Sequence, residues 1–291
     1  MLIEILKAIA FGIIEGITEW LPVSSTGHLI LLGDRLSLGV TGELGAEFED
    51  MFNFVIQLGA ILAVLILYRK RFYFWGRGKS REEKRDALSL VGRIAVASIP
   101  AAVVGILGDK LLWHFTGKDL DGYFYNSLTV AVMLIAYGVL FIVAEWFCRK
   151  PSGKDIGARS AFKISAGKAF AIGCFQALSV IPGTSRSGAT MLGARLLGID
   201  RKEAAEFSFF LGVPAIAGAS IFKAADFAEY VSSSNVSVPI EAYAVLFAAT
   251  LTSFFVSMLT IKALIGFVRK HSFAPFGVYR IILGIIVILF S

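Results

Sequence analysis

Long apolar runs recur along this chain, and the shorter connections between them hold most of its charged residues. Each run is close to the ~20 residues that a helix needs to cross a bilayer. The pattern predicts an all-α polytopic membrane protein with about six transmembrane helices, built as a single membrane domain over residues 1–291. The runs are Met51–Tyr68, Leu88–Leu107, Leu128–Phe147, Phe207–Phe222, Ala242–Phe267 and Phe276–Phe290.

Composition supports this class. Hydrophobic residues make up 56% of the chain and charged residues only 17%, against roughly 25% charged in soluble domains. The net charge of +6 at first suggests nucleic acid, but the cations are concentrated in a few connections, so we expect no nucleic-acid partner. Cys148 and Cys174 lie in or beside apolar segments and support neither a disulfide nor a metal site.

The loop charges predict the topology. Lysine and arginine are concentrated in residues 69–93 and 147–168, whereas acidic residues precede Met51 and occur in residues 226–241. The positive-inside rule puts the basic connections in the cytoplasm and the acidic ones outside. Both termini are then expected outside.

Two stretches outside the six runs place polar groups in apolar surroundings, Glu15–His28 and Pro182–Thr190. Both contain proline and glycine, and we expect two re-entrant helical hairpins, because irregular backbone at membrane depth needs shielding by protein or a cavity. The first stretch is not expected to be lost with a cleaved signal, because no basic region precedes it.

The two stretches also predict an inverted-topology repeat, with halves of about 1–148 and 160–291. Each half holds one hairpin and three spans, and the odd number turns the second half upside-down relative to the first. The matching letters are Gly12-x-x-Glu15 with Gly173-x-x-Gln176, Pro22-x-x-Ser25 with Pro182-x-x-Ser185, and Leu58-Gly59 with Leu211-Gly212.

Glu15 and Glu19 are four residues apart and therefore lie on one helix face. Two carboxylates this close in an apolar setting need a cation between them. A divalent cation, Mg²⁺ or Ca²⁺, is one solution, and both residues are candidate ligands. The alternative is a structural pair that binds backbone groups or Lys7.

Ser24, Ser25 and Thr26 follow the Pro22 break and mark a helix start, where free N–H groups favour an anion. One of these hydroxyls is expected to be an N-cap, which leaves another for substrate binding or catalysis. His28 is either a satisfied buried histidine or, beside the carboxylates and hydroxyls, an acid or base.

Arg186 is the most informative residue of the second stretch, because a guanidinium matches phosphate bidentately. Ser185, Ser187 and Thr190 are candidate phosphate donors, although the last two could instead bond within their helix. Gln176 stands where the first half has Glu15, so it can offer only a hydrogen bond.

Two further polar positions are more simply explained by structure. Asn53 and Gln57 stand one turn apart in a predicted span and are typical of residues that join helices. Arg280, after Tyr279 near the start of the last run, is expected to be an interfacial anchor.

Together, E-G-I-T-E-W-L-P-V-S-S-T-G-H and P-G-T-S-R-S-G-A-T resemble the two signature motifs of bacterial undecaprenyl-diphosphate phosphatases of the bacitracin-resistance type. The resemblance covers almost the whole chain, including I-Q-L-G at Ile56–Gly59, which makes Gln57 a candidate substrate-binding residue, and F-x-P-F-x-x-Y-R at Phe273–Arg280.

The resemblance implies hydrolysis of undecaprenyl diphosphate to the monophosphate carrier lipid of cell-wall synthesis. It also implies a divalent-cation requirement and a multi-pass location in the bacterial plasma (inner) membrane, with an active site open to the outer face. The family's polar positions fall on Glu15, Glu19, Ser25, His28, Arg186 and Thr190.

The residues leave several alternatives open. Ser25 is the expected nucleophile, activated by His28 or a glutamate, but water or His28 could attack instead. A transporter or flippase for polyprenyl phosphate would use the same anion site without cleavage, and a purely structural membrane subunit fits the intramembrane charges poorly. The expected partners are the lipid substrate and the membrane; whether the protein is a monomer or a homodimer stays open.

Overall fold

The computed structural model describes the chain except for residues 34, 73–79, 118–119, 125, 149–163 and 291. All the regular structure in the described part is helical. The helices are α1 (Leu2–Thr18), α2 (Ser25–Gly33), α3 (Thr41–Val55), α4 (Gln57–Leu67), α5 (Arg69–Phe72), α6 (Arg81–Thr116), α7 (Leu120–Phe124), α8 (Ser127–Phe147), α9 (Ala166–Ala177), the 3₁₀-helix η2 (Leu178–Val180), α10 (Arg186–Leu196), α11 (Arg201–Ser234), α12 (Ile240–Val268) and α13 (Ala274–Phe290).

The predicted all-α polytopic class is confirmed. Five helical stretches are long and apolar enough to cross a membrane, among the residues that the structure describes. The sixth predicted span corresponds to α13, an apolar helix of 17 residues. The five long stretches are Leu44–Leu67, Arg81–Thr116, Ser127–Phe147, Arg201–Ser234 and Ile240–Val268.

Local chemistry explains where several of these helices begin. At the start of α6, Ser80 and Glu83 form a capping box in which each side chain accepts a hydrogen bond from the other's backbone N–H. Asn126 caps α8 by accepting from the Thr129 N–H, and Asp200 caps α11. These caps satisfy N–H groups that have no partner within the helix.

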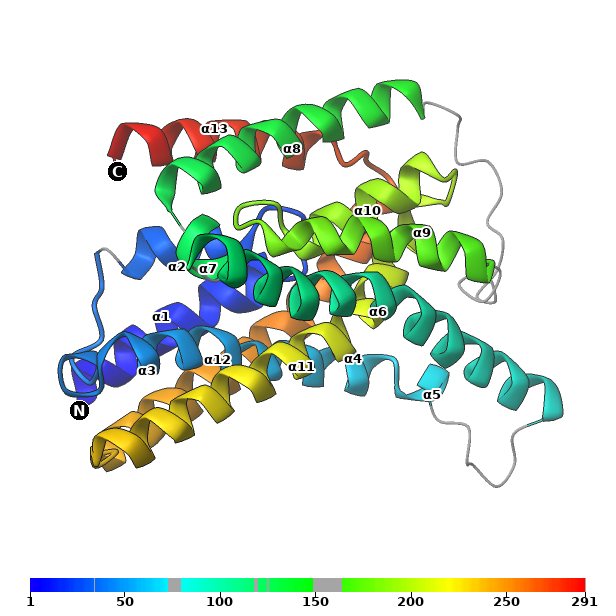
Figure 1. Cartoon of the computed structure of the whole chain (residues 1–291). Helices are drawn as coiled ribbons and strands as arrows, with labels where there is room; N and C mark the ends of the chain where they lie inside the picture. Colours follow the sequence, from blue (N-terminus) through cyan, green and yellow to red (C-terminus); the bar gives the residue numbers. More distant parts are fainter. Residues whose placement is uncertain (34, 73–79, 118–119, 125, 149–163, 291) are drawn as a thin grey trace.

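Helices from the two predicted halves of the chain pack against each other in matching pairs (Figure 1). Helix α1 packs on α12 and α9 packs on α6, while α8 and α13 lie against each other. At the last contact, a Cβ added to Gly138 would lie 2.7 Å from the Gly277 carbonyl oxygen, and one added to Gly277 would lie 2.6 Å from that of Gly138. An internal two-fold arrangement would produce this packing; the inverted repeat and its halves, like the re-entrant hairpins, stay a prediction.

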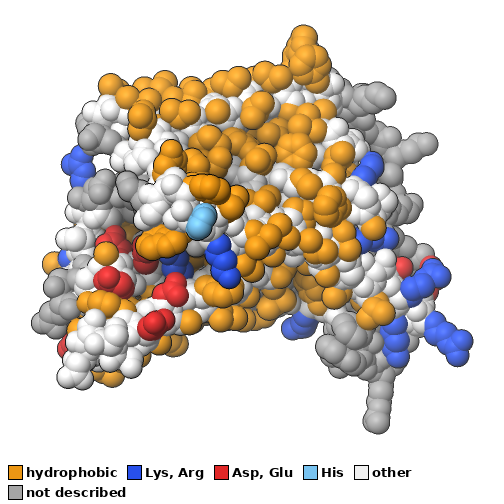
Figure 2. Space-filling model, in the orientation of Figure 1, with side chains coloured by type: hydrophobic (Ala, Val, Ile, Leu, Met, Phe, Trp, Pro, Cys, Tyr) orange, Lys and Arg blue, Asp and Glu red, His pale blue; other side chains and the backbone are white. Residues whose placement is uncertain are grey.

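Charge is distributed unevenly over the surface (Figure 2). Acidic side chains gather at one end of the bundle, on the left of the view, and lysine and arginine gather at the other. Exposed Glu47 and Asp50 on α3 contribute to the first group, and Arg69 and Arg81 to the second. The predicted topology is consistent with this polarity, although much of the two basic connections, including Lys79 and Lys154, lies outside the described residues.

Candidate active site

The two motifs form two turns that meet inside the bundle. The first turn, residues 19–24, joins α1 to α2, and the second turn, residues 181–185, joins η2 to α10. Each ends in a serine with a positive backbone φ, 72° at Ser24 and 69° at Ser185. Such a conformation is uncommon for a residue other than glycine and often marks a functional site.

The turns share a capping pattern that corrects the predicted repeat register. Ser24 Oγ accepts a hydrogen bond from the Gly27 N–H, and Ser185 Oγ accepts one from the Gly188 N–H. Ser24, not Ser25, therefore corresponds to Ser185, and the expected register was wrong by one residue. Glu15 and Ser24 are nine residues apart, as are Gln176 and Ser185, so the turns are equally long and only the two prolines are out of register. Pro22 corresponds to Gly183, which has a φ of 88°.

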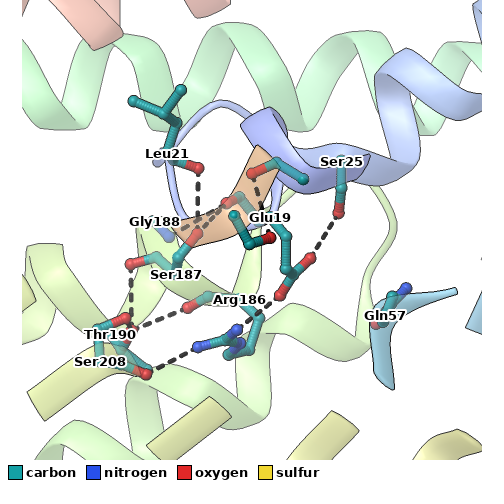
Figure 3. Close-up of polar contacts among 12 residues, drawn as sticks. Glu19, Leu21, Ser25, Gln57, Arg186, Ser187, Gly188, Thr190 and Ser208 are labelled. Carbon is teal, nitrogen blue, oxygen red and sulfur yellow. Dashed lines mark hydrogen bonds and ion pairs between the residues drawn. The ribbon is translucent and has the colours of Figure 1, made fainter. Parts of the chain in front are cut away.

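In this register Ser25, the first residue of α2, corresponds to Arg186, the first residue of α10. The Ser25 hydroxyl donates to Glu19 Oε2 over 2.9 Å (Figure 3). Ser24 is the N-cap, so the hydroxyl next to it is the one left to face the carboxylate.

Arg186 reaches the same carboxylate from the other half of the chain. Its Nη2 lies 2.6 Å from Glu19 Oε1, and its Nη1 donates to the Ser208 carbonyl over 2.8 Å. The guanidinium also lies over the Trp20 ring, 5.4 Å from the centroid. Because Glu19 binds both Ser25 and Arg186, the two turns form one site.

Glu15 lies one turn before Glu19 and is 0% exposed. The Glu19 N–H donates to the Glu15 carbonyl, so the two side chains share a helix face as expected. Neither carboxylate oxygen of Glu15 has a hydrogen-bond partner among the described residues. Lys7, the alternative partner, instead pairs with Glu4 over 2.9 Å.

These contacts decide how well the acidic pair fits a divalent cation. Both oxygens of Glu19 already bind protein groups, whereas both oxygens of Glu15 are buried without partners. No cluster of three or more histidine, cysteine or acidic side chains that could hold a metal occurs in the described part of the chain. The site therefore fits a cation such as Mg²⁺ that takes one or two protein carboxylates and completes its shell with phosphate and water.

The hydroxyls of Ser187 and Thr190, on α10 just after the second turn, make contacts within the protein. Ser187 Oγ donates to the Leu21 carbonyl over 3.1 Å and so ties the second turn to the first. Thr190 Oγ1 contacts the Arg186 and Ser187 carbonyls within its own helix and the Ser208 hydroxyl at 2.6 Å. Thr190 is 0% exposed, so its back-bonding alternative describes the structure better than the phosphate-donor one.

The remaining predicted binding residues, Gln57, Gln176 and Thr26, lie in different surroundings. Gln57 Nε2, at the start of α4, donates to the Asn53 carbonyl of α3, four residues earlier in the same apolar span, and Figure 3 places Gln57 to the side of Glu19 and Ser25. Gln176 is buried, with both amide atoms unpartnered among the described residues. Thr26 is partly exposed beside Ser25.

Both ring nitrogens of His28 contact groups other than the Glu19 carboxylate. Its Nδ1 lies 2.7 Å from the Ser24 carbonyl oxygen and its Nε2 lies 2.7 Å from the Tyr279 hydroxyl. Because a carbonyl can only accept, Nδ1 carries the proton in a neutral ring and Nε2 accepts from Tyr279. The two rings are stacked, with planes 4° apart. Glu19, not His28, contacts the Ser25 hydroxyl.

Arg280 is not an interfacial anchor, and that prediction was wrong. The side chain is 0% exposed. Its Nη1 donates to the Pro22 carbonyl over 3.2 Å, and its Nη2 donates to the carbonyls of Gly183 and Thr184 over 2.7 and 2.9 Å. One guanidinium thus joins both turns. The signal was the Tyr-Arg pair of F-x-P-F-x-x-Y-R, whose two side chains both reach the site.

Gly212 is a further residue that sequence reasoning did not assign to the site. A Cβ added there would lie 2.5 Å from Cζ of Arg186. A side chain at this position on α11 would therefore displace the guanidinium. The repeated Leu-Gly pair was the sequence signal, but the reason for the glycine appears only when α10 and α11 are placed together.

Known proteins resemble this chain over nearly its whole length. The family described as "Bacitracin resistance protein BacA" matches residues 8–286. A protein named undecaprenyl-diphosphatase from Enterococcus faecalis is 45% identical over 99% of this chain and 98% of its own length. Proteins of the same name from Streptococcus thermophilus and Acetivibrio thermocellus are 45% and 42% identical, over 100% and 99% of this chain and 94% and 98% of their own lengths.

Proposed function

This chain belongs to the family described as bacitracin resistance protein BacA, and we propose that it hydrolyses undecaprenyl diphosphate to undecaprenyl phosphate and inorganic phosphate. The reaction returns the carrier lipid to cell-wall synthesis and so confers bacitracin resistance. The observation that carries the proposal is that Ser25 and Arg186 bind the same carboxylate, Glu19. A nucleophile, a proton acceptor and a phosphate-binding cation are thereby in one place.

In the proposed reaction, Ser25 Oγ attacks the terminal phosphorus of the diphosphate. Glu19 Oε2, already 2.9 Å from the hydroxyl, takes its proton. The bond from that phosphorus to the bridging oxygen breaks, and the bridging oxygen leaves with the electron pair on the lipid monophosphate. Water then attacks the phosphoserine and releases inorganic phosphate. Direct attack by water, with Glu19 as base, is the alternative.

Arg186 neutralises charge on the transferring group. Its guanidinium is held by the Ser208 carbonyl and lies over Trp20, so its direction is set before substrate arrives. Nη2 would exchange the Glu19 oxygen for a phosphate oxygen, which also frees Glu19 to accept the serine proton. Phosphoryl transfer depends mainly on positioning and electrostatic stabilisation, and a planar cation suits both.

A divalent cation is the remaining proposed component. When bound, it would neutralise part of the diphosphate charge. Glu15 would hold it, since both of its oxygens are buried and unpartnered among the described residues, and Glu19 lies on the same helix face. The buried carboxylate otherwise needs a proton or another cation.

Helix α13 supplies the positioning residues of the site. Arg280 holds the carbonyls of both turns, and Tyr279 holds His28. His28 in turn holds the Ser24 carbonyl, next to Ser25. We assign His28 the same indirect role, because both ring nitrogens already have partners.

The charge distribution supports a location in the bacterial plasma membrane with the site reached from the outer face. The acidic end of the bundle, with Glu47 and Asp50, would face outward, and the basic end with Arg69 and Arg81 would face the cytoplasm.

Phosphate release by the purified protein tests the proposal. Protein in detergent is given undecaprenyl diphosphate and either Mg²⁺, Ca²⁺ or a chelator, and inorganic phosphate is measured. We expect cation-dependent release that Ser25→Ala removes. Protein that binds the lipid, moves it across a vesicle bilayer and releases no phosphate would favour the polyprenyl phosphate transporter and overturn the hydrolase.

A further inference from the structure

A groove at the basic end of the bundle is separate from the two turns. It lies where α4 and α5 meet the end of α12. Two cavities, of about 470 and about 370 Å³, both include Leu67 and Tyr68 in their walls. Such volumes fall within the range of small-ligand sites. None of the predicted site residues lines either cavity.

The charge of the groove has one sign. Its charged lining residues are Arg69, Lys70 and Arg71 from the α4–α5 side and Lys262 and Arg269 from the α12 side, and none of the described lining residues is acidic. Arg71 is partly neutralised by Glu206 at 3.3 Å. Cations from two helices therefore converge on one concave surface, which suits an anion.

The α12 wall is open because of a glycine. Lys262, Gly266 and Arg269 are four and three residues apart, so they lie on one face of the helix. A Cβ added to Gly266 would meet nothing within 4 Å. Glycine weakens a helix interior, and here no packing against protein requires it. Because glycine has no side chain, the groove is deeper between Lys262 and Arg269.

The rest of the wall is apolar and faces the lipid side. Ile66 is 44% exposed, and Leu67 and Ile265 are partly exposed. A free phosphate ion would gain nothing from this surface, whereas hydrocarbon would cover it. The groove thus offers cations for a head group and an apolar wall for a chain.

We propose that this groove binds an anionic phospholipid, with its phosphate head group between Lys262, Arg269 and the α5 cations and its hydrocarbon along α4 and α12. On the predicted topology, the lipid belongs to the cytoplasmic leaflet. Basic pockets between membrane helices on that side suit anionic head groups. The site is independent of the hydrolase reaction.

Lipid binding in bilayer discs tests the proposal. Discs of phosphatidylcholine containing increasing phosphatidylglycerol are prepared with wild-type protein, and lipids retained by the protein are counted by native mass spectrometry. We expect saturable retention of phosphatidylglycerol. The double variant Lys262→Gln/Arg269→Gln should bind roughly tenfold or more weakly, since each cation contributes to attraction of the anionic head group. Gly266→Leu should weaken binding similarly with no change of charge.

The matched control is Lys84→Gln/Arg85→Gln, which removes two exposed cations of α6 that do not line the groove. It should bind like wild type, and phosphate release in detergent should be unchanged in all variants. Equal weakening in the control would mean a diffuse charge effect and overturn the proposal. Retention of wild-type binding by either groove variant would also overturn it, as would equal competition by water-soluble glycerol phosphate.

Discussion

The first and second turns have the same backbone device and different chemistry. Each ends in a serine of positive φ that caps the next helix through a glycine three residues later. After the capping serine, however, the first turn places Ser25 and the second places Arg186. One strained turn can thus be followed by either a hydroxyl or a guanidinium, depending on a single side chain.

The helices that precede the two turns also carry different side chains at matching positions. Helix α1 brings the buried Glu15, and α9 brings the buried Gln176, at matching positions. In the proposed reaction, only α1 and the first turn therefore supply carboxylates, for a cation and for the serine proton. The first turn would then need Arg186 from beyond the second turn to complete one site.

Removing the nucleophile should give the largest effect. Ser25→Ala should lower phosphate release to background, because the hydroxyl on Glu19 is lost, and Ser25→Cys should also be impaired. Ser24→Ala is the matched change one residue earlier; it should keep turnover and cost about 1 kcal/mol of stability through the lost cap. Activity is measured by phosphate release and stability by thermal unfolding. Equal turnover in Ser25→Ala and wild type would remove serine from the mechanism.

Changing the cation of the second turn should have the next largest effect. Arg186→Lys should lower turnover by about 10³-fold, because a point charge imitates a planar guanidinium poorly on a transferring phosphoryl group. Arg201→Lys, which alters an arginine paired with Glu145 away from the turns, is the control and should retain activity. A functional Arg186→Lys protein would mean that the second turn contributes only its backbone.

Displacing the same guanidinium without replacing it should have a smaller effect. Gly212→Ala puts a methyl carbon 2.5 Å from Cζ of Arg186, too close for the guanidinium to stay in place, and we expect turnover to fall roughly tenfold to a hundredfold with the fold intact, as small misplacements of a catalytic group do. Gly218→Ala on the same helix meets nothing within 4 Å and serves as control. If both variants behave alike, the position of Arg186 is not set by α11.

The activity of variants of the acidic pair should depend most strongly on which divalent cation is supplied. Glu15→Gln and Glu19→Gln should each lower turnover at least roughly tenfold, and Glu15→Gln should also weaken or shift the requirement for Mg²⁺ or Ca²⁺. Titration of activity with each cation is the measurement. Glu206→Gln, a buried acid paired with Arg71, should leave the cation requirement unchanged. Wild-type rate and cation dependence in both site variants would make the pair structural.

Much of the fold and of the candidate site could be predicted from sequence. The apolar runs predicted the long helices because crossing a bilayer demands both length and hydrophobicity. The turn motifs stood out because ionisable groups are expensive at depth. The repeat register was wrong by one residue, because Pro22 and Pro182 look equivalent as letters but stand two and three residues before the capping serines Ser24 and Ser185. Arg280 was misplaced because its position near a helix start is equally compatible with an interface and with burial.

The sequence alone determined the class of the protein, its two turns and the residue types available for phosphate chemistry. Tertiary structure decided which hydroxyl faces Glu19, that Arg280 joins the turns and that Gly212 makes room for Arg186. The physical reason is that lipid and protein interior are similarly apolar. The pattern of a membrane helix therefore marks its depth but not the face that it turns inward, and only packing against the other half of the chain settles that.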